Sequence, residues 1–469
     1  MKKGGHKVRD AFSAMSLDQT DFGRIYSNLP HVTEAPTTLE ELALTLKKYH
    51  QNGTPVTIRN TGHSVNGQTL TKGAQVRVGN IKHLSFDKER MEVSCGAGVS
   101  WDEMLKAIGF PAFCPPVFPN NPGQQIHVTG NVAVGGIGFY GARQGGLWNH
   151  VRRIKLVTMK GEIITCSPEE NPEYFYYSLG GFGRIGVIGE LTLGVKPSSS
   201  LTLGMILAYV NRDTYHQDTR KIVRDSSVSG VMMLEFFGLL KPVLGMGVFV
   251  DVRNETERGA LAQEITDKYQ EGLRVHIKGA VPHSMDIGAR THHLKKLQVV
   301  YFYPQFDGEI QLDRCHPWGD YAVPEGRYRD FMAFVKSAIS KYKMEKYLIR
   351  ETGFHHQLDA PLLGTYPIRR ITDTFPLTLD IPGEEYGFAV SILPTVPSQE
   401  VDRATAMNQV IIDAVYGMGG RMYLYGLHQL TKKQIQRHFG SSVLEQWQNI
   451  KDELDPKHLL NIGVIEHLD

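Results

Sequence analysis

Residues 58–68, IRNTGHSVNGQ, constrain the fold of this chain more than any other segment. The β-branched run before them predicts a strand, which must stop where Gly62, His63 and Ser64 form a turn. Small residues let backbone N–H groups approach a ligand, and a turn can direct several of them at one anion. With Arg59 before the turn and an imidazole inside it, the loop is suited to hold a pyrophosphate beside a nucleophilic side chain. An ordinary surface turn is the alternative for Gly-His-Ser taken alone.

The composition describes a soluble globular protein. A length of 469 residues predicts two or three domains, and 41% hydrophobic and 21% charged residues are ordinary values. A net charge of +2 without a dense Lys/Arg run argues against a nucleic-acid partner. The sequence has no 18-residue apolar run and no signal-peptide core, so we expect no membrane partner and a cytoplasmic chain. The four scattered cysteines predict buried thiols; they are Cys95, Cys114, Cys166 and Cys315.

The order of periodic segments predicts an α+β fold. In the first part, a capping-box pattern opens a helix at residue 37, and three strands and a short helix over 101–108 come next. Residues 196–200, KPSSS, are a plausible boundary. The second part reads as an antiparallel sheet with helices on one side. Its expected strands include 201–210, 245–254 and 295–305, and its expected helices include 328–342 and 401–417.

Two segments match G-x-G-x-x-G, at residues 136–141 and 181–186. A nicotinamide-binding fold needs a strand before this motif and a helix directly after it, because the helix N-terminus holds the pyrophosphate. Gly145 and Gly146 would break a helix after the first motif, and residues 187–195 read as a strand after the second. Neither motif therefore predicts a Rossmann fold.

Several separated segments, in order, resemble the vanillyl-alcohol-oxidase family of FAD-linked oxidases, and most closely its cytokinin dehydrogenase branch. They are IRNTGHSVNGQ, VTGNVAVGGIGFYGARQGGLWNHV, YFYYSLGGFGRIGVIGELTLGV, HPWGDYAVP, RMYLYGLHQLTKKQIQRHFG and DPKHLLNIG. The resemblance implies a two-part PCMH-type FAD-binding domain over residues 1–198 and a substrate-binding cap domain over 199–420. It implies also a C-terminal segment, 421–469, that returns to the FAD-binding domain.

The resemblance implies one FAD per chain, joined covalently to His63 and held at its pyrophosphate by the backbone of residues 59–64. Some family members add a cysteinyl bond, but residues 122–126 contain no cysteine and Cys114 lies several residues too early, so we expect a single bond. The implied cofactor residues are Ile58, Arg59, Asn60, Thr61, Gly62, His63, Ser64, Gln68, His127, Thr129, Gly130, Asn131, Ala133, Val187, Ile188, Tyr425 and Asn461.

The reaction centre departs from the resemblance. The flavin accepts the hydride, so the protein must supply a base for the substrate's N–H or O–H proton. The aspartate that serves in the cytokinin dehydrogenases aligns with Pro122, and Ala133 and Val464 stand where a serine and a glutamine are expected. We expect oxidation of a C–N or C–O bond of a small molecule, with electrons passed to O₂ or another acceptor. An alcohol or sugar oxidase and a catalytically inactive flavin protein remain alternatives.

Three residues are candidates for the missing base: His127, Glu235 and Tyr425. His127 has a suitable ordinary pKa but fits a framework role equally well. Glu235 lies in an apolar run, where a salt-bridged strand residue is the alternative, and Tyr425 could instead belong to the core. The histidine pairs 292–293 and 355–356 would point to opposite faces of a strand, so no metal site is expected. The oligomeric state stays open.

Overall fold

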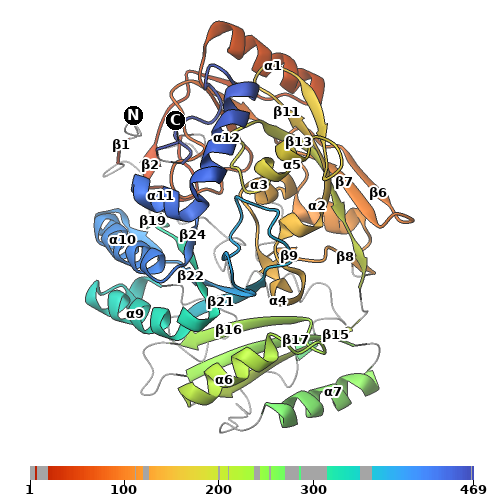
Figure 1. Ribbon diagram of the computed structural model, residues 1–469, viewed down its shortest axis with the longest axis vertical. Coiled ribbons are helices and arrows are strands. Elements are labelled where there is room, and N and C mark those ends of the chain that lie inside the picture. Colours follow the sequence, from red (N-terminus) through yellow and green to blue (C-terminus); the bar gives the residue numbers. More distant parts are fainter. Residues whose placement is uncertain are drawn as a thin grey trace.

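The computed structural model describes residues 6–7, 19–110, 112–119, 126–198, 201–209, 211–236, 243–252, 255–269, 285–286, 314–348, 362–465 and 467–468. The strand expected at 295–305, both histidine pairs and Pro122 lie outside these residues. Figure 1 shows the N-terminal sheets and the C-terminal helices in the upper half, above a large sheet built by the middle of the chain.

A small parallel sheet carries the loop that begins after residue 58. It contains β3 (Val32–Glu34), β5 (Ala74–Arg77) and β4 (Val56–Arg59), in that order. Helix α1 (Leu39–Asn52) connects β3 to β4. The Thr38 hydroxyl accepts the N–H of Glu41, and the helix ends at Gly53 with φ +67°. The predicted capping box is only half formed, because the Glu41 carboxylate accepts from Thr37 and not from the N–H of Thr38.

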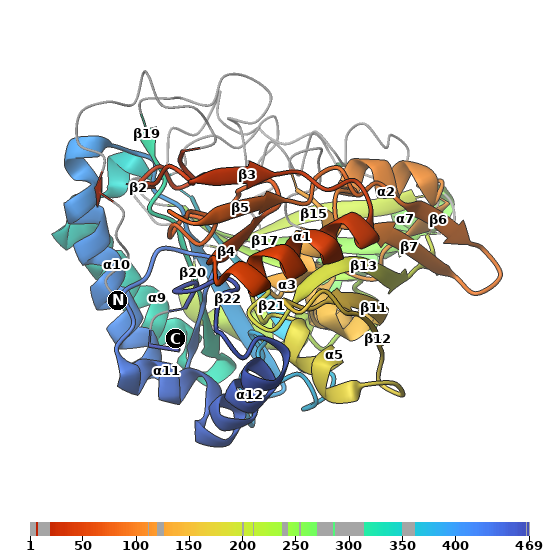
Figure 2. The ribbon, with the colours of Figure 1, turned by 90° about the horizontal axis from the view of Figure 1, so that it is seen from above.

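A five-stranded antiparallel sheet comes next (Figure 2), in the order β12-β11-β13-β7-β6. Its strands are β6 (Leu84–Asp87), β7 (Glu92–Gly96), β11 (Val151–Val157), β12 (Ile163–Cys166) and β13 (Val187–Gly194). The helices of this part are α2 (Trp101–Ala107), α3 (Val128–Ala133), α4 (Gly141–Gln144) and α5 (Pro172–Ser178). The first glycine motif leads into one helical turn, α4, which stops at Gly145 with φ +70°, and the second leads into strand β13. Neither motif opens a Rossmann helix.

An eight-stranded sheet, here called the cap sheet, has the order β18-β15-β17-β16-β21-β22-β20-β24, and every described pairing is antiparallel. The strands are β15 (Leu201–Tyr209), β16 (Gly230–Phe236), β17 (Val243–Val252), β18 (Met285–Asp286), β20 (Gly319–Pro324), β21 (Leu362–Arg369), β22 (Tyr386–Ile392) and β24 (Arg421–Tyr423). Helices α6 (Arg212–Ile222) and α7 (Glu255–Lys268) pack on one end of it, and α9 (Tyr328–Lys341) and α10 (Val401–Gly417) on the other (Figure 1). The predicted antiparallel sheet with helices is confirmed. Since β24 belongs to it, the cap sheet continues past residue 420.

Short elements complete the described chain. The strands are β1 (His6–Lys7), β2 (Tyr26–Ser27), β8 (Phe113–Cys114), β9 (Phe118–Pro119), β10 (Gly138–Phe139), β14 (Lys196–Pro197), β19 (Arg314–Cys315) and β23 (Val396–Pro397). The C-terminal helices are α11 (Lys432–Phe439) and α12 (Ser441–Leu454), and four 3₁₀ turns of the described chain span Leu147–His150, Glu325–Arg327, Glu345–Tyr347 and Ser398–Glu400. No helix among the described residues is long and apolar enough to cross a lipid bilayer.

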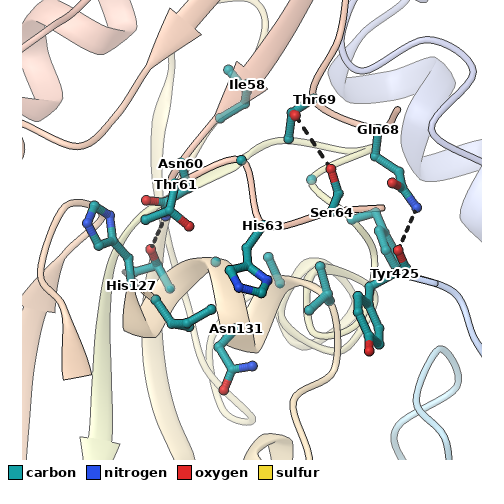
Figure 3. A pocket seen from close by; sticks show the side chains of 18 of the residues that line it. Ile58, Asn60, Thr61, His63, Ser64, Gln68, Thr69, His127, Asn131 and Tyr425 are labelled. Carbon is teal, nitrogen blue, oxygen red and sulfur yellow. Dashed lines mark hydrogen bonds between the residues drawn. The ribbon is translucent and has the colours of Figure 1, made fainter. Parts of the chain in front are cut away.

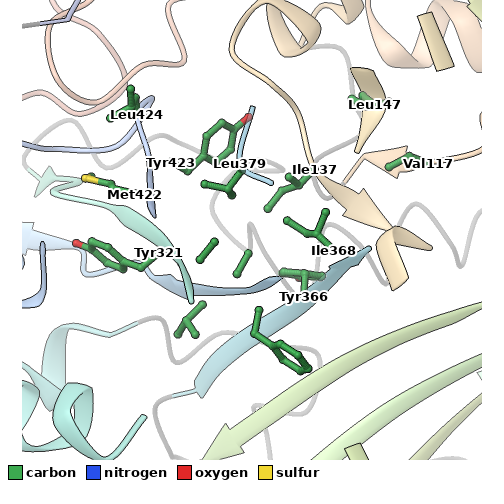
Figure 4. Close-up of a cluster of buried hydrophobic side chains, with 14 of the residues drawn as sticks. Val117, Ile137, Leu147, Tyr321, Tyr366, Ile368, Leu379, Met422, Tyr423 and Leu424 are labelled. Atoms are coloured by element: carbon green, nitrogen blue, oxygen red, sulfur yellow. The ribbon is translucent and has the colours of Figure 1, made fainter. Parts of the chain in front are cut away.

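One apolar core joins the two parts of the molecule. Figure 4 shows Ile137 of the N-terminal part close to Ile368 and Tyr366 of the cap sheet, and all three side chains are buried. Because burial of apolar surface is the main stabilising term in folding, this contact holds the two parts in a fixed arrangement. The four cysteines are buried free thiols, as predicted.

A buried lysine ties the C-terminal helices to the N-terminal part. The side chain of Lys451 on α12 is fully buried, and its Nζ forms an ion pair of 2.7 Å with Asp455. The same Nζ donates to the carbonyls of Arg184, at 2.8 Å, and Leu460, at 2.9 Å. All three protons of the ammonium are thereby used, and the turn before β13 is fixed against the segment that comes after α12.

Candidate active site

A cavity lies where the loop after β4, helix α3, the C-terminal segment and the cap sheet meet (Figure 3). The residues that line it come from segments 403 residues apart in sequence, as the bond between Ile58 and Asn461 shows. Its lining residues are Ile58, Asn60, Thr61, Gly62, His63, Ser64, Gln68, Thr69, Val78, Ile126, His127, Thr129, Gly130, Asn131, Ala133, Val134, Ile137, Phe182, Gly183, Val187, Ile188, Asp320, Ser391, Leu393, Tyr423, Tyr425, Asn461 and Val464.

The structure brings the predicted cofactor residues together in this cavity, with one exception. Arg59 does not line it. Successive side chains of a strand point to opposite faces, and in β4 it is Ile58 that faces the cavity. The Arg59 guanidinium lies instead behind the turn, where a Cβ added to Gly62 would meet its Nη2 at 2.3 Å. With φ +75° as well, position 62 requires glycine.

His63 lies in the middle of the cavity wall (Figure 3). Its ring stacks on Phe22 with a centroid distance of 4.3 Å and an interplanar angle of 11°. Burial lowers the pKa of His63 to about 4. At neutral pH the imidazole is therefore uncharged, which leaves one ring nitrogen with the lone pair that a nucleophile needs.

The C-terminal segment closes the cavity by hydrogen bonds to the loop. Gln68 Nε2 donates to the Leu424 carbonyl at 2.9 Å, and the Val65 N–H donates to the Tyr425 carbonyl at 3.4 Å. Asn461 accepts the N–H of Ile58 at 2.8 Å through Oδ1. Its Nδ2 donates to the carbonyls of Phe182 and Gly183 at 3.2 and 2.9 Å. These bonds position β4 against the second glycine motif.

One end of the cavity is polar and belongs to the N-terminal part. Asn60 Nδ2 and Thr129 Oγ1 both donate to the Ala97 carbonyl, at 3.1 and 2.9 Å. Among the described residues, Asn60 Oδ1, His127 Nδ1 and Asn131 Oδ1 are buried without a hydrogen-bond partner. Buried polar atoms are rarely left in this state, so this end is built for a polar ligand.

His127 belongs to this polar end. It precedes α3 as its N-cap residue, and Figure 3 shows it and Tyr425 on opposite sides of His63. Burial, together with the smaller effect of the charge of Lys82, lowers the pKa of His127 to about 4. A group with so low a pKa is a weak base at pH 7.

At the other end, the cap sheet contributes a carboxyl group that sequence reasoning missed. Asp320 on β20 lines the cavity, and its side chain is 5% exposed. Tyr425 Oη donates to Asp320 Oδ2 at 2.5 Å, and Ser391 Oγ donates to Asp320 Oδ1. Burial raises the pKa of Asp320, while the two hydroxyl donors act in the opposite direction. An acidic residue inside the apolar segment HPWGDYAVP was the available signal.

Glu235 is not among the residues that line the cavity. It lies on β16 with 1% of its surface exposed and forms an ion pair with Lys336 of α9. The structure therefore favours the salt-bridge alternative for Glu235. Among the described residues, no three His, Cys, Asp or Glu side chains come together in a way that could hold a metal ion.

Sequence comparisons match both halves of this arrangement. Residues 30–167 match a profile described as an FAD binding domain, and residues 307–465 one described as cytokinin dehydrogenase 1, FAD and cytokinin binding. Together the two profiles span more than half of the chain. The chain belongs to the FAD-linked oxidases and dehydrogenases.

This oxidoreductase is distantly related to cytokinin dehydrogenases. It is 25% identical to cytokinin dehydrogenase 2 of Arabidopsis thaliana over 96% of the chain and 91% of the relative. Identity is 26% to cytokinin dehydrogenase 1 of Oryza sativa subsp. japonica, over 97% and 91%. It is 23% to an uncharacterized oxidoreductase, ORF5 in the fasciation locus of Rhodococcoides fascians, over 94% and 95%.

The cavity of this oxidoreductase fits FAD. The unpartnered amide oxygens of Asn60 and Asn131 offer acceptors for hydroxyl groups, and the loop of Gly62 brings backbone close to the cavity. A side chain at position 130 would press on Asn60 Nδ2, because a Cβ there would lie 3.0 Å from it. Cys114 lies on β8 and is absent from the lining, as is every other cysteine.

Proposed function

We propose that this oxidoreductase removes two electrons from a C–N bond of a small or medium-sized amine. His63 would hold FAD in the cavity, and the flavin would supply the hydride acceptor, with O₂ or another acceptor as the final oxidant. One observation carries the proposal. A single cavity joins the Gly-His-Ser loop to a carboxyl–hydroxyl pair, Asp320 and Tyr425, so that a hydride site and a proton-accepting group share one space.

The walls of the cavity support a substrate with a hydrocarbon part. Val134, Ile137, Leu393 and Val464 line the cavity together with Ile188. Apolar walls favour hydrocarbon groups because these groups leave water when they bind, whereas a sugar needs a hydrogen-bond partner for each hydroxyl. An amine is therefore favoured over a sugar. Oxidation of an apolar alcohol is the second candidate, since Tyr425 and Asp320 can accept an O–H proton as well as an N–H proton.

Anaerobic mixing with candidate donors tests the proposed function. We expect secondary amines with an apolar substituent to bleach the flavin absorbance, and sugars to leave it unchanged. Bleaching by alcohols and not by amines would replace the C–N reaction with a C–O reaction. A protein with a normal flavin spectrum that no donor bleaches would refute catalysis and favour a flavin-binding role.

The proposed covalent bond makes a separate prediction. His63→Ala should release all flavin into the supernatant on denaturation, because no other imidazole or thiol is placed in the loop. Wild type should keep its flavin in the precipitated protein. His127→Ala is the matched control, since it removes an imidazole from the polar end of the same cavity and should leave the flavin attached. Free flavin from denatured wild type would contradict the bond.

A further inference from the structure

Asp320 of the cap sheet presents a buried carboxyl group to the cavity. It is buried, it lines the cavity, and each of its oxygens accepts one hydroxyl proton, from Tyr425 and from Ser391. Among the described residues, no Lys, Arg or His forms an ion pair with it. Burial, and to a smaller extent the charge of Asp320, raises the pKa of Tyr321, its neighbour in β20. A buried carboxyl without a cation is costly, and such groups gather at functional sites.

The register of the cap sheet creates this cluster. Asp320 lies directly opposite Ser391 of β22 in one pairing and opposite Tyr423 of β24 in the other. Because β24 ends at Tyr423, the chain turns there and brings Tyr425 to the carboxyl. The backbone of Tyr425 is fixed at the same time by Gln68 and Val65 of the loop. The loop that carries His63 thus holds the backbone of Tyr425, while the hydroxyl of Tyr425 donates to the carboxyl of Asp320.

The other candidate bases are less suited. His127 lies across His63 from Tyr425, at the polar end (Figure 3), and Glu235 is paired with Lys336 outside the lining. The resemblance would place the aspartate of the cytokinin dehydrogenases at Pro122, which carries no base. A carboxyl from a different segment is available to take over its task.

We propose that Asp320 is the proton acceptor of this oxidoreductase and that Tyr425 relays the substrate's proton to it. The inference rests on the proposed function. As the C–H hydrogen leaves the substrate with its electron pair, the N–H proton moves to Tyr425 Oη, and the proton of that hydroxyl moves to Asp320 Oδ2. The substrate gains a C=N bond, the flavin receives two electrons and one hydrogen, and the carboxyl receives the proton. Asp320 later returns this proton to solvent.

Flavin reduction as a function of pH tests the relay. Wild type should be reduced faster as pH rises through the pKa of Asp320. Asp320→Asn should slow reduction at least roughly a hundredfold and remove the pH dependence, because general-base assistance contributes about 10²–10⁴ in rate. Tyr425→Phe should slow it similarly, and Asp320→Glu should restore part of the rate. Ser391→Ala should move the pH profile upward, since it removes a donor that favours the charged carboxylate.

Asp380→Asn is the matched control. Asp380 is also a buried acid, bonded to Trp148 and Thr378, and burial raises its pKa to about 6, but it does not line the cavity. Its replacement should leave the rate of flavin reduction and its pH profile unchanged. An equal loss in Asp380→Asn and Asp320→Asn would assign both residues to the framework and overturn the relay.

The free energy of unfolding, measured as a function of pH, tests the ionisation of Asp320 without enzymatic turnover. A folded-state pKa raised above the unfolded value stabilises the protein below the unfolded pKa, and this stability is lost as pH rises through the folded pKa. Wild type should therefore lose stability relative to Asp320→Asn as the pH rises across that range. A difference between the two proteins that does not change with pH would overturn the inference.

The kinetic outcomes separate the two proposals. If a donor bleaches wild type and Asp320→Asn within a few-fold of each other, the proposed function stands and the relay is overturned. If no donor bleaches wild type, both fail. If Asp320→Asn does not fold, the test uses the pH dependence of flavin reduction in Asp320→Glu and Ser391→Ala. A displaced pH profile in these variants supports the relay, and profiles identical to that of wild type would overturn it.

Discussion

Lowering the pH from 7 to 4.5 should destabilise the protein strongly, through histidines that are buried in the folded state. Burial lowers the pKa of His316 to about 3, that of His216 to about 4, and that of His438 well below its ordinary value. The pKa of His127 is lowered similarly. Each imidazole is neutral in the folded protein, while the unfolded chain binds a proton below about pH 6.5.

The sign of the effect is set by proton uptake. The stability contributed by a lowered histidine pKa is present above the unfolded pKa and is lost as pH falls toward the folded pKa. For His316 the loss at pH 4.5 is on the order of 2–3 kcal/mol, because one pKa unit corresponds to about 1.4 kcal/mol. Asp320 and Asp380, whose pKa values are raised, act in the opposite direction. Four buried histidines lose stability at low pH and only these two aspartates gain it, so the protein should be less stable at pH 4.5 than at pH 7.

Urea unfolding between pH 4.5 and 7 measures this dependence. His438→Asn can keep the hydrogen bond that Tyr416 and His438 share at 2.7 Å, and it should reduce the slope of unfolding free energy against pH by about one proton. The matched control is His31→Asn, which removes an imidazole from the exposed surface in place of a buried one. A flat profile in wild type would contradict the buried, neutral state of these histidines.

Lys451→Met should lower the free energy of unfolding by about 3–5 kcal/mol, which is the usual cost of breaking a buried ion pair. The substitution leaves the Asp455 carboxylate without its cation and removes the donor to the carbonyls of Arg184 and Leu460. Those two residues adjoin Gly183 and Asn461, which line the cavity. The same variant should therefore bind less FAD.

Urea midpoints and flavin content test this prediction together. Adding Asp455→Asn to Lys451→Met should recover part of the stability, because the amide removes the unpaired charge and can still accept the N–H of Leu460. The exposed Lys457→Met, in the same segment, should change stability by less than about 0.5 kcal/mol. A comparably small change in Lys451→Met would show that the buried ion pair of Lys451 and Asp455 does not stabilise the protein.

The sequence predicted those elements whose signals are local. Helix α10 begins and ends as expected, at Val401–Gly417, and α9 at Tyr328–Lys341 differs from its prediction by one residue. Both have a 3.6-residue apolar period with a clear end. The glycine motifs were distinguished from a Rossmann fold by the glycines and the strand pattern on their C-terminal side. The pairing of the strands could not be predicted, because no residue near Asp320 in the sequence indicates that Ser391 lies opposite it.

The site was predictable in the loop and not in the cap sheet. The turn within residues 58–68 depends on a glycine of the same segment, Gly62. That these residues line the cavity could therefore be predicted from the sequence. Asp320 and Glu235 present the same signal, an acidic residue in an apolar strand, and only the partner decides between them. Lys336 neutralises Glu235, whereas hydroxyl groups face Asp320.

Because the C-terminal segment closes the cavity, the cavity can be completed only late in the synthesis of the chain. Gln68 and its partner Leu424 are 356 residues apart, and Ile58 and Asn461 are 403 residues apart. At roughly 5–20 residues per second, the ribosome needs roughly 20–70 s to reach Leu424 after Gln68. During that interval the histidine loop exists without its cover.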